Sequence, residues 1–180
     1  MRARPTNSRV NPCASPWMVV RWNPEVTVAA IAEVDGRVLM VEERIDGKLV
    51  LNQPAGHLED RETLVEAVVR EAREETAWQF RPEALVGVYL WRNPVNERTF
   101  MRFAFCGAAD GHDPKQPLDI GIVRAVWMTH EQLVAQPARL RSPLVLRCLE
   151  DYRRGSRQPL ESVASLGLDS AMHMDAAVSL

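Results

Sequence analysis

Short apolar runs separated by turn signals fill much of the chain. VTVAAIAEV and VLMVEE flank the turn signal DGR and predict a β-hairpin over residues 26–43. A second turn signal, Asp46-Gly47, precedes LVLNQPAGH. Further strands are predicted over residues 85–91, 99–108 and 123–128. The pattern therefore predicts a domain in which strands are the main elements.

Between the predicted hairpin and the later strands, the apolar spacing changes to that of a helix. Asp60 is the expected N-cap of this helix. Its apolar positions recur three and four residues apart, at Leu64, Val65, Val68, Val69 and Ala72. This stripe predicts a central helix that packs one face against the body of the protein.

Two further helices are predicted after the last strand. Thr129 and Gln132 form a capping-box pattern that opens a helix to about residue 135. Ser142, followed by Pro143 at the first helical position, opens a last helix to about residue 154. Strands around one central helix and two later helices place the chain in the α+β class.

The length of 180 residues suits one domain with a sound core. Residues 1–21 are rich in Pro, Asn, Ser and Arg and predict an irregular N-terminal extension. We expect the folded domain to occupy residues 22–162. Residues 163–180 are expected to form a flexible C-terminal tail.

Charge and composition argue against several kinds of partner. The 24 acidic residues nearly balance the 22 basic ones, so the overall field favours neither nucleic acid nor membrane. No apolar run approaches the roughly 20 residues needed to cross a bilayer. The three cysteines include no CxxC pair, which argues against a structural zinc site and a disulfide framework. We therefore expect a cytoplasmic protein that acts on a small molecule.

The central helix carries acids at its unfavourable end. Glu71, Glu74 and Glu75 lie toward the C-terminus, where the helix dipole favours cations and where the three carboxylates repel one another. At about 100° per residue, Glu75 projects within about 20° of Leu64, on the core-ward face. A solvated face of helical ion pairs is one interpretation, but it does not explain an acid on that face. A hard divalent cation bound through carboxylate oxygens does.

The stretch GHLEDRETLVEAVVREAREETAW, residues 56–78, resembles the signature of the Nudix hydrolase family. The matching positions are Gly56, Glu62, Arg70, Glu71, Ala72, Glu74, Glu75, Ala77 and Trp78. One position departs from the signature, because Ala77 stands where the family has glycine. Glycine there suits a left-handed helix C-cap. We expect a slightly altered cap rather than loss of activity, since the acids lie upstream.

The resemblance extends beyond this signature. VTVAAIAEVDGRVLMVEE, NQPAGHLE, ETLVEA and LRSPLV, followed by DY and PLE, are similar to the phosphatase NudJ subgroup over roughly residues 25–162. This resemblance implies the Nudix fold, an α/β/α sandwich around a mixed sheet with a catalytic loop-helix-loop. It also implies an enzyme that hydrolyses phosphoanhydride bonds.

The resemblance implies roles for the residues of the signature. The implied catalytic residues, which also bind Mg²⁺ (or Mn²⁺ as the alternative ion), are Glu71, Glu74 and Glu75. The backbone carbonyl of Ala55 is implied as a further metal ligand. Glu62 and Arg70 are implied to be structural and to hold the loop and the helix in register.

Weaker signals suggest contacts to the substrate. The candidates are His57, Gln53, Arg44, Trp91 and Asp119. His57 either touches a phosphate or caps the loop, and Trp91 either stacks on a ring or belongs to the core. Either a carboxylate of the signature or one on a later loop accepts the proton. Asp119 is the candidate for the later loop, with a solvated loop aspartate as the alternative. Gln53 is expected to face the cleft together with its neighbour Asn52.

Three basic residues have two interpretations each. Arg44, Lys48 and Arg102 either pair with phosphates or form exposed salt bridges. The substrate is expected to be a nucleoside or pyrimidine di- or triphosphate, and the subgroup adds thiamine diphosphate. The alternatives are a pyrophosphatase for dinucleotides such as ADP-ribose and a non-catalytic nucleotide-sensing Nudix module. The protein is expected to be a monomer or a homodimer.

Overall fold

The computed structural model describes residues 22–168, so the predicted extension over residues 1–21 and the end of the predicted tail lie outside the described residues. The strands are β1 (Glu25–Val34), β2 (Arg37–Ile45), β3 (Lys48–Asn52), β4 (Ala55–His57), β5 (Gln79–Arg92), β6 (Thr99–Asp110) and β7 (Ile122–Thr129). The helices are α1 (Leu64–Thr76), α2 (His130–Val134) and α3 (Leu144–Arg153), with short 3₁₀ turns at Pro137–Arg139 and Leu160–Ser162. The predicted hairpin and the order of the elements are confirmed.

The strands form a mixed sheet in the order β3-β2-β1-β6-β5, with β4 paired to β1 and β7 paired to β2. β1 and β6 are parallel, and the other pairs are antiparallel. β1 and β2 pair only at Glu33↔Val38 and Val34↔Arg37, beside their turn. Beyond that point β1 pairs with β4 instead, so the half made of β2, β3 and β7 diverges from the half made of β1, β4, β5 and β6.

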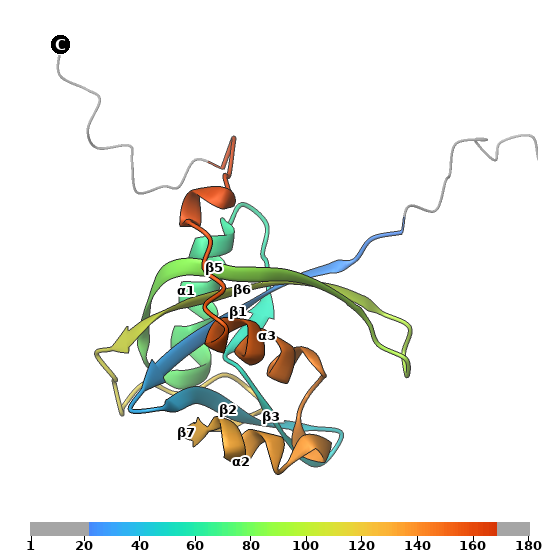
Figure 1. Cartoon of the computed structure of the whole chain (residues 1–180), viewed down its shortest axis with the longest axis vertical. Helices are drawn as coiled ribbons and strands as arrows, with labels where there is room; N and C mark the ends of the chain where they lie inside the picture. The colour runs from blue at the N-terminus through green and yellow to red at the C-terminus, as the bar shows by residue number, and fades with distance from the viewer. Residues whose placement is uncertain (1–21, 169–180) are drawn as a thin grey trace, which may run out of the picture.

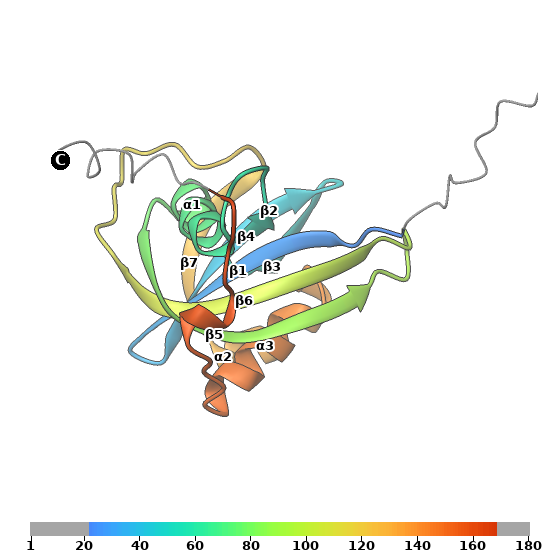
Figure 2. The ribbon, with the colours of Figure 1, turned by 90° about the horizontal axis from the view of Figure 1, so that it is seen from above.

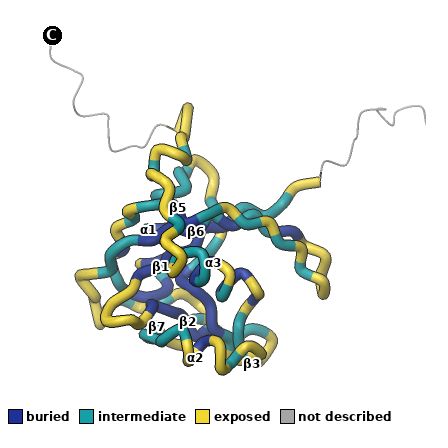
Figure 3. The backbone as a smooth tube through the Cα atoms, viewed as in Figure 1, coloured by how far each residue is buried: buried dark blue, intermediate teal, exposed yellow. Residues whose placement is uncertain are grey.

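Helices cover both faces of the sheet, with α1 on one side and α2 and α3 on the other (Figures 1 and 2). Side chains alternate along β1, so this strand contributes apolar side chains to the core layers on both faces of the sheet. Val28 and Ala30 pack in the cluster that contains Val68 of α1, whereas Ile31 packs in the cluster that contains Val145 of α3. The buried segments therefore run through the strands at the centre of the molecule (Figure 3). This arrangement confirms the α/β/α sandwich.

The start of α1 differs from the sequence expectation. Asp60 is not its N-cap, because the helix begins three residues later, after Thr63. Thr63 Oγ1 accepts from the Glu66 amide at 3.1 Å, and the Glu66 carboxylate accepts from the Thr63 amide at 2.9 Å. This reciprocal capping box satisfies two amide groups, whereas Asp60 would satisfy one.

Two other boundaries are corrected. Ser142 does not cap α3 with its side chain, because the helix follows Pro143 and the Ser142 hydroxyl has no hydrogen-bond partner. β5 begins at Gln79 rather than near residue 85. The sequence did not suggest that the strand includes residues 79–84, because residue 82 is proline, which is uncommon inside strands. The structure accommodates it on an edge strand, where the register shifts between Pro82 and Ala84.

Candidate active site

Glu75 joins the end of α1 to the sheet. Its side chain points toward the core-ward side, as its helical angle predicts, and the residue is 8% exposed. Its Oε2 accepts a hydrogen bond from the backbone amide of Ala55 at 2.8 Å. The contact therefore places a carboxylate from the last turn of the helix directly against β4.

Glu71 lies one turn earlier and is 7% exposed. It packs so closely on Gly56 that a Cβ at that position would lie 2.1 Å from its carboxyl carbon. A side chain at residue 56 would displace this carboxylate, so glycine allows Glu71 to keep its present position. The spacing that resembles the family signature corresponds here to a direct contact between β4 and α1.

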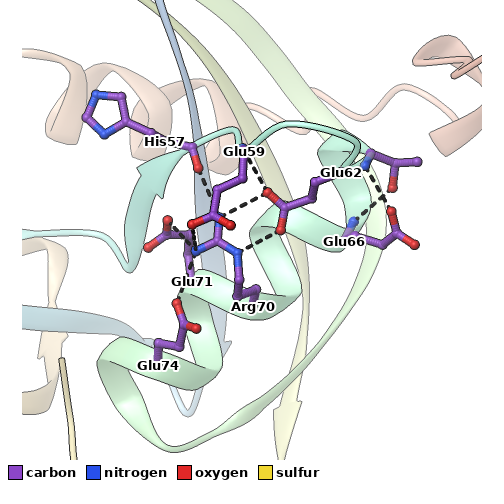
Figure 4. Close-up of polar contacts among 8 residues, drawn as sticks. His57, Glu59, Glu62, Glu66, Arg70, Glu71 and Glu74 are labelled. Atoms are coloured by element: carbon purple, nitrogen blue, oxygen red, sulfur yellow. Dashed lines mark hydrogen bonds and ion pairs between the residues drawn. The ribbon is translucent and has the colours of Figure 1, made fainter. Parts of the chain in front are cut away.

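Arg70 binds the surrounding acids and the loop before the helix (Figure 4). Its Nε donates to Glu62 Oε1 at 2.7 Å, and its Nη1 donates to Glu71 Oε1 at 2.8 Å and to Glu74 Oε2 at 3.0 Å. Its Nη2 donates to the His57 carbonyl at 3.0 Å. These contacts agree with the structural role expected of Glu62 and Arg70, and they also hold Glu71 and Glu74 on the same nitrogen, Arg70 Nη1.

Burial changes the protonation of the buried acids. Burial raises the pKa of Glu75 to about 8, and the neighbouring Glu71 and Glu43 carboxylates add to the rise. Burial also raises the pKa of Glu71, although its hydrogen bond from Arg70 acts in the opposite direction. Two buried carboxyl groups with so few partners are electrostatically costly, and a bound cation would relieve the cost.

A cleft of about 1090 Å³ opens beside these carboxylates. It is lined from both halves of the sheet, by β1, β4, β5 and β6 on one side and β2 and β3 on the other. Glu71, Glu74 and Glu75 all line it. Of the other predicted residues, the cleft lining includes Ala55, His57, Trp91, Asp119, Asn52, Lys48 and Arg102.

Two of these residues already have partners. His57 Nε2 lies 2.9 Å from Glu25 Oε2, and the His57 side chain is 59% exposed. The Trp91 ring stacks on Phe100 with centroids 5.8 Å apart.

Asp119 is tied to the end of α1, because its amide donates to the Glu74 carbonyl at 3.0 Å. Asp119 is thus held near the acid cluster by its backbone, and its side chain is exposed to the cleft.

Two predicted substrate contacts are corrected. Gln53 is 0% exposed and does not line the cleft. Its side-chain amide donates to the Val145 carbonyl at 2.8 Å, so it ties the sheet to α3. Arg44 is exposed but lies outside the cleft, because successive strand residues point to opposite faces and its neighbour Glu43 occupies the cleft side.

The structure also brings residues to the cleft that the sequence did not suggest. Glu43, Thr27 and Ser142 line it and are largely covered. Burial raises the pKa of Glu43, and Arg141 opposes that rise. One sequence signal could have indicated Glu43 as a cleft residue. It lies two residues after the apolar Val41, so both side chains point to the same face of β2.

Carboxylate oxygens are ligands of the kind that a hard divalent cation binds. In the structure, however, these carboxylates are not already arranged around a common ion position. Within residues 22–168 no three acidic, imidazole or thiol groups are already placed as a metal-binding set. Arg70 engages Oε1 of Glu71 and Ala55 engages Oε2 of Glu75. The second oxygen of each accepts no hydrogen bond from the described residues, so each carboxylate keeps one oxygen that could bind an ion.

The fold and the contacts around α1 agree with a comparison of the chain with known protein families. A family model described as NUDIX domain matches residues 22–147. The chain therefore belongs to the Nudix family and is a Nudix hydrolase, an enzyme that acts on phosphoanhydride bonds.

Individual relatives agree with this assignment. Phosphatase NudJ of Escherichia coli is 42% identical over 142 residues, which cover 79% of this chain and 92% of that protein. The protein of the same name from Shigella flexneri matches to the same extent. Among solved structures, a NUDIX hydrolase from Nitrosomonas europaea is 45% identical with a TM-score of 0.79, covering 82% of this chain and 100% of that one.

More distant structures share the fold alone. The MutT protein from Methanosarcina mazei Go1 is 20% identical, with a TM-score of 0.59 over 74% of this chain and 97% of that chain. In the described part of the chain, no helix is long and apolar enough to cross a membrane.

Proposed function

We propose that this protein hydrolyses a phosphoanhydride bond of nucleoside di- and triphosphates with Mg²⁺ as its metal and Mn²⁺ as a substitute. Glu71, Glu74, Glu75 and the carbonyl of Ala55 would hold the ion. One observation carries this proposal: two carboxylates from a helix are buried where they face a cleft of about 1090 Å³. Likeness to the phosphatases NudJ supports pyrimidine diphosphates and thiamine diphosphate as further substrates.

Different residues of the chain have different roles in the proposed reaction. When bound, the metal would neutralise phosphate oxygens and lower the pKa of the attacking water. Arg70 holds Glu71 and Glu74 in place through charged hydrogen bonds. Asp119 would accept the proton of the attacking water; its exposure in the cleft and its backbone bond to the end of α1 support this role.

The two alternative functions have different support. The cleft is large enough for a dinucleotide of the ADP-ribose type, because ligand pockets span roughly 300–1,000 Å³. A nucleotide-sensing module does not require acidic residues at the C-terminal end of a helix, where they are electrostatically unfavourable. All three acids are present, which favours catalysis.

A panel of substrates tests the proposal. With Mg²⁺ present, release of inorganic phosphate or pyrophosphate is measured for nucleoside di- and triphosphates and for thiamine diphosphate, and formation of AMP and ribose 5-phosphate is measured for ADP-ribose. We expect turnover of the first two groups and little of ADP-ribose. Nucleotide binding without turnover of any compound would favour the sensing module. Turnover of ADP-ribose alone would favour the dinucleotide enzyme.

A further inference from the structure

The loop between β6 and β7, residues 111–121, closes the C-terminal end of α1. The last carbonyl groups of a helix lack partners within the helix itself, so other groups must supply their donors. Three donors of the loop bind carbonyl groups at this end of α1, and they are the amides of Asp113 and Asp119 and the side chain of Gln116. The loop therefore caps the helix whose acids line the cleft.

Gln116 supplies the side-chain part of this cap. Its side-chain nitrogen donates to the Arg73 carbonyl at 2.5 Å, and its side-chain oxygen accepts from Arg73 Nε at 3.2 Å. One glutamine amide thus binds both the backbone and the side chain of a single helical residue. Among the described residues of the loop, only Gln116 forms side-chain hydrogen bonds with α1.

Asp119 lies three residues after Gln116 and is bound to the same end of the helix. Its amide donates to the Glu74 carbonyl at 3.0 Å, and its side chain lines the cleft together with Glu71 and Glu75. Burial raises the pKa of both glutamates, and the nearby Asp119 carboxylate adds to both rises. The position of the Asp119 carboxylate beside the acid cluster therefore depends on how the loop is held against α1.

The loop has little other support. Glycines with positive φ stand at its two ends, with angles of 57° at Gly111 and 96° at Gly121. All of its residues except Gln116 and Leu118 are exposed. A segment that buries so little surface is held mainly by its few hydrogen bonds. Without the two bonds of Gln116, backbone bonds alone would hold Asp119 against the helix.

We propose that Gln116 is a positioning residue that keeps the Asp119 carboxylate within reach of the attacking water. A proton acceptor acts only within hydrogen-bond distance of the proton that it takes. A displacement of about 1 Å can lower a rate roughly a hundredfold. Gln116 does not line the cleft, so its effect on the reaction must pass through Asp119. This inference rests on the proposed function and adds the residue that places its proton acceptor.

A double-mutant cycle in the full chain tests the inference, with kcat and KM measured with Mg²⁺ on the best substrate of the panel. Gln116→Met keeps the length of the side chain but lacks the amide that forms both hydrogen bonds. It should lower kcat about tenfold and change KM less than about twofold, because the proton acceptor is needed for the chemical step rather than for binding. Asp119→Asn should lower kcat at least about a hundredfold. Adding Gln116→Met to Asp119→Asn should cause no further loss, because the residue through which Gln116 acts is already disabled.

Hydrogen exchange measured by NMR gives a readout that does not depend on activity. In Gln116→Met the Asp119 amide should exchange severalfold faster than in the wild type, whereas the Ala55 amide, which is bound to Glu75, should keep its rate. Lys115→Met is the matched control. It changes the exposed neighbour of Gln116, so kcat and both exchange rates should equal those of the wild type.

Three results would overturn the inference while hydrolysis itself stands. The first is an unchanged kcat in Gln116→Met. The second is an equal fractional loss from Gln116→Met with and without the Asp119 carboxylate, which would show a role in stability alone. The third is wild-type turnover in Asp119→Asn, which would show that another group accepts the proton. If no compound of the panel is hydrolysed, the proposed function fails. The exchange rate of the Asp119 amide then decides whether Gln116 holds the loop, with an equal rate overturning it.

Discussion

At the scale of single residues, the buried carboxylates of α1 carry the proposed chemistry. Glu75 and Glu71 are nearly covered, yet each is held by only a few contacts, to Ala55 and to Arg70 respectively. A buried acid with this little compensation is costly in a folded protein. Its cost is explained if an ion and a substrate phosphate complete the surroundings.

Removing one of these charges should therefore affect turnover more than folding. We expect Glu75→Gln and Glu71→Gln each to lower kcat at least about a hundredfold, because each removes charge stabilisation from the transition state. Steady-state phosphate release measures the loss, and circular dichroism checks the fold. The glutamine at residue 75 can still accept from the Ala55 amide.

Glu66→Gln is the matched control on the same helix. Glutamine also closes a capping box with Thr63, so activity should remain close to that of the wild type. Comparable turnover in the wild type and Glu75→Gln would contradict the metal-site proposal.

At the scale of elements, α1 is defined at both ends by local chemistry. Its start is the Thr63–Glu66 capping box, and its end is Ala77 in the left-handed conformation, with φ of 59°. The Ala77 amide donates to the Arg73 carbonyl at 2.8 Å. The helix thus ends as the family signature implies, although alanine replaces glycine.

Ala77→Gly should raise the melting temperature by about 1–3 °C. Relief of the left-handed strain, about 1–2 kcal/mol, exceeds the loss of one buried methyl, about 0.8 kcal/mol. Differential scanning calorimetry measures the change. Ala135, the C-cap of α2, has φ of −70°, so Ala135→Gly should lower the melting temperature instead. A lower melting temperature for Ala77→Gly would show that its buried methyl group outweighs the strain.

At the scale of the whole molecule, the cleft lies between two halves of one sheet that part beyond the β1–β2 turn. β4 pairs with β1 and bonds to Glu75, so α1 is anchored where the halves separate. An ion bound between α1 and β4 would consequently strengthen a junction on which the folded arrangement depends. Metal binding and global stability should therefore be linked.

Mg²⁺ should stabilise the folded protein. At one hundred times its dissociation constant, an ion that binds only the folded state adds about 2.7 kcal/mol, which is several degrees in melting temperature for a chain of this size. Mn²⁺ should act similarly. Glu75→Gln should lose most of this effect and should be more stable than the wild type without metal, because the buried Glu75 carboxyl must take up a proton on folding whereas glutamine is neutral in both states.

The control for this experiment is NaCl at the same ionic strength, which screens surface charges without binding the site. If millimolar Mg²⁺ shifts the melting temperature no further than NaCl does, the clustered carboxylates are not a metal site.

The sequence by itself determined the features that depend on local spacing. The apolar stripe predicted α1 and placed Glu75 on its core-ward face, and the turn signals predicted the β1–β2 hairpin. The resemblance to the family signature identified the fold and the enzyme class, both of which are confirmed. The left-handed conformation expected for the signature glycine is present at Ala77. The helix and the hairpin follow from residue periods and turn signals that the sequence displays directly, whereas the fold, the enzyme class and the left-handed cap were implied by the resemblance.

Only the tertiary structure decided which polar side chains enter the cleft. Asn52 and Gln53 are neighbours, yet one faces the cleft and the other binds α3. Glu43 faces the cleft, whereas Arg44 beside it does not. Side chains alternate along a strand, so the sequence gives two sets of residues without showing which set faces inward. That choice depends on strand pairing between distant segments, which also buries Arg102 of β6 beside the cleft.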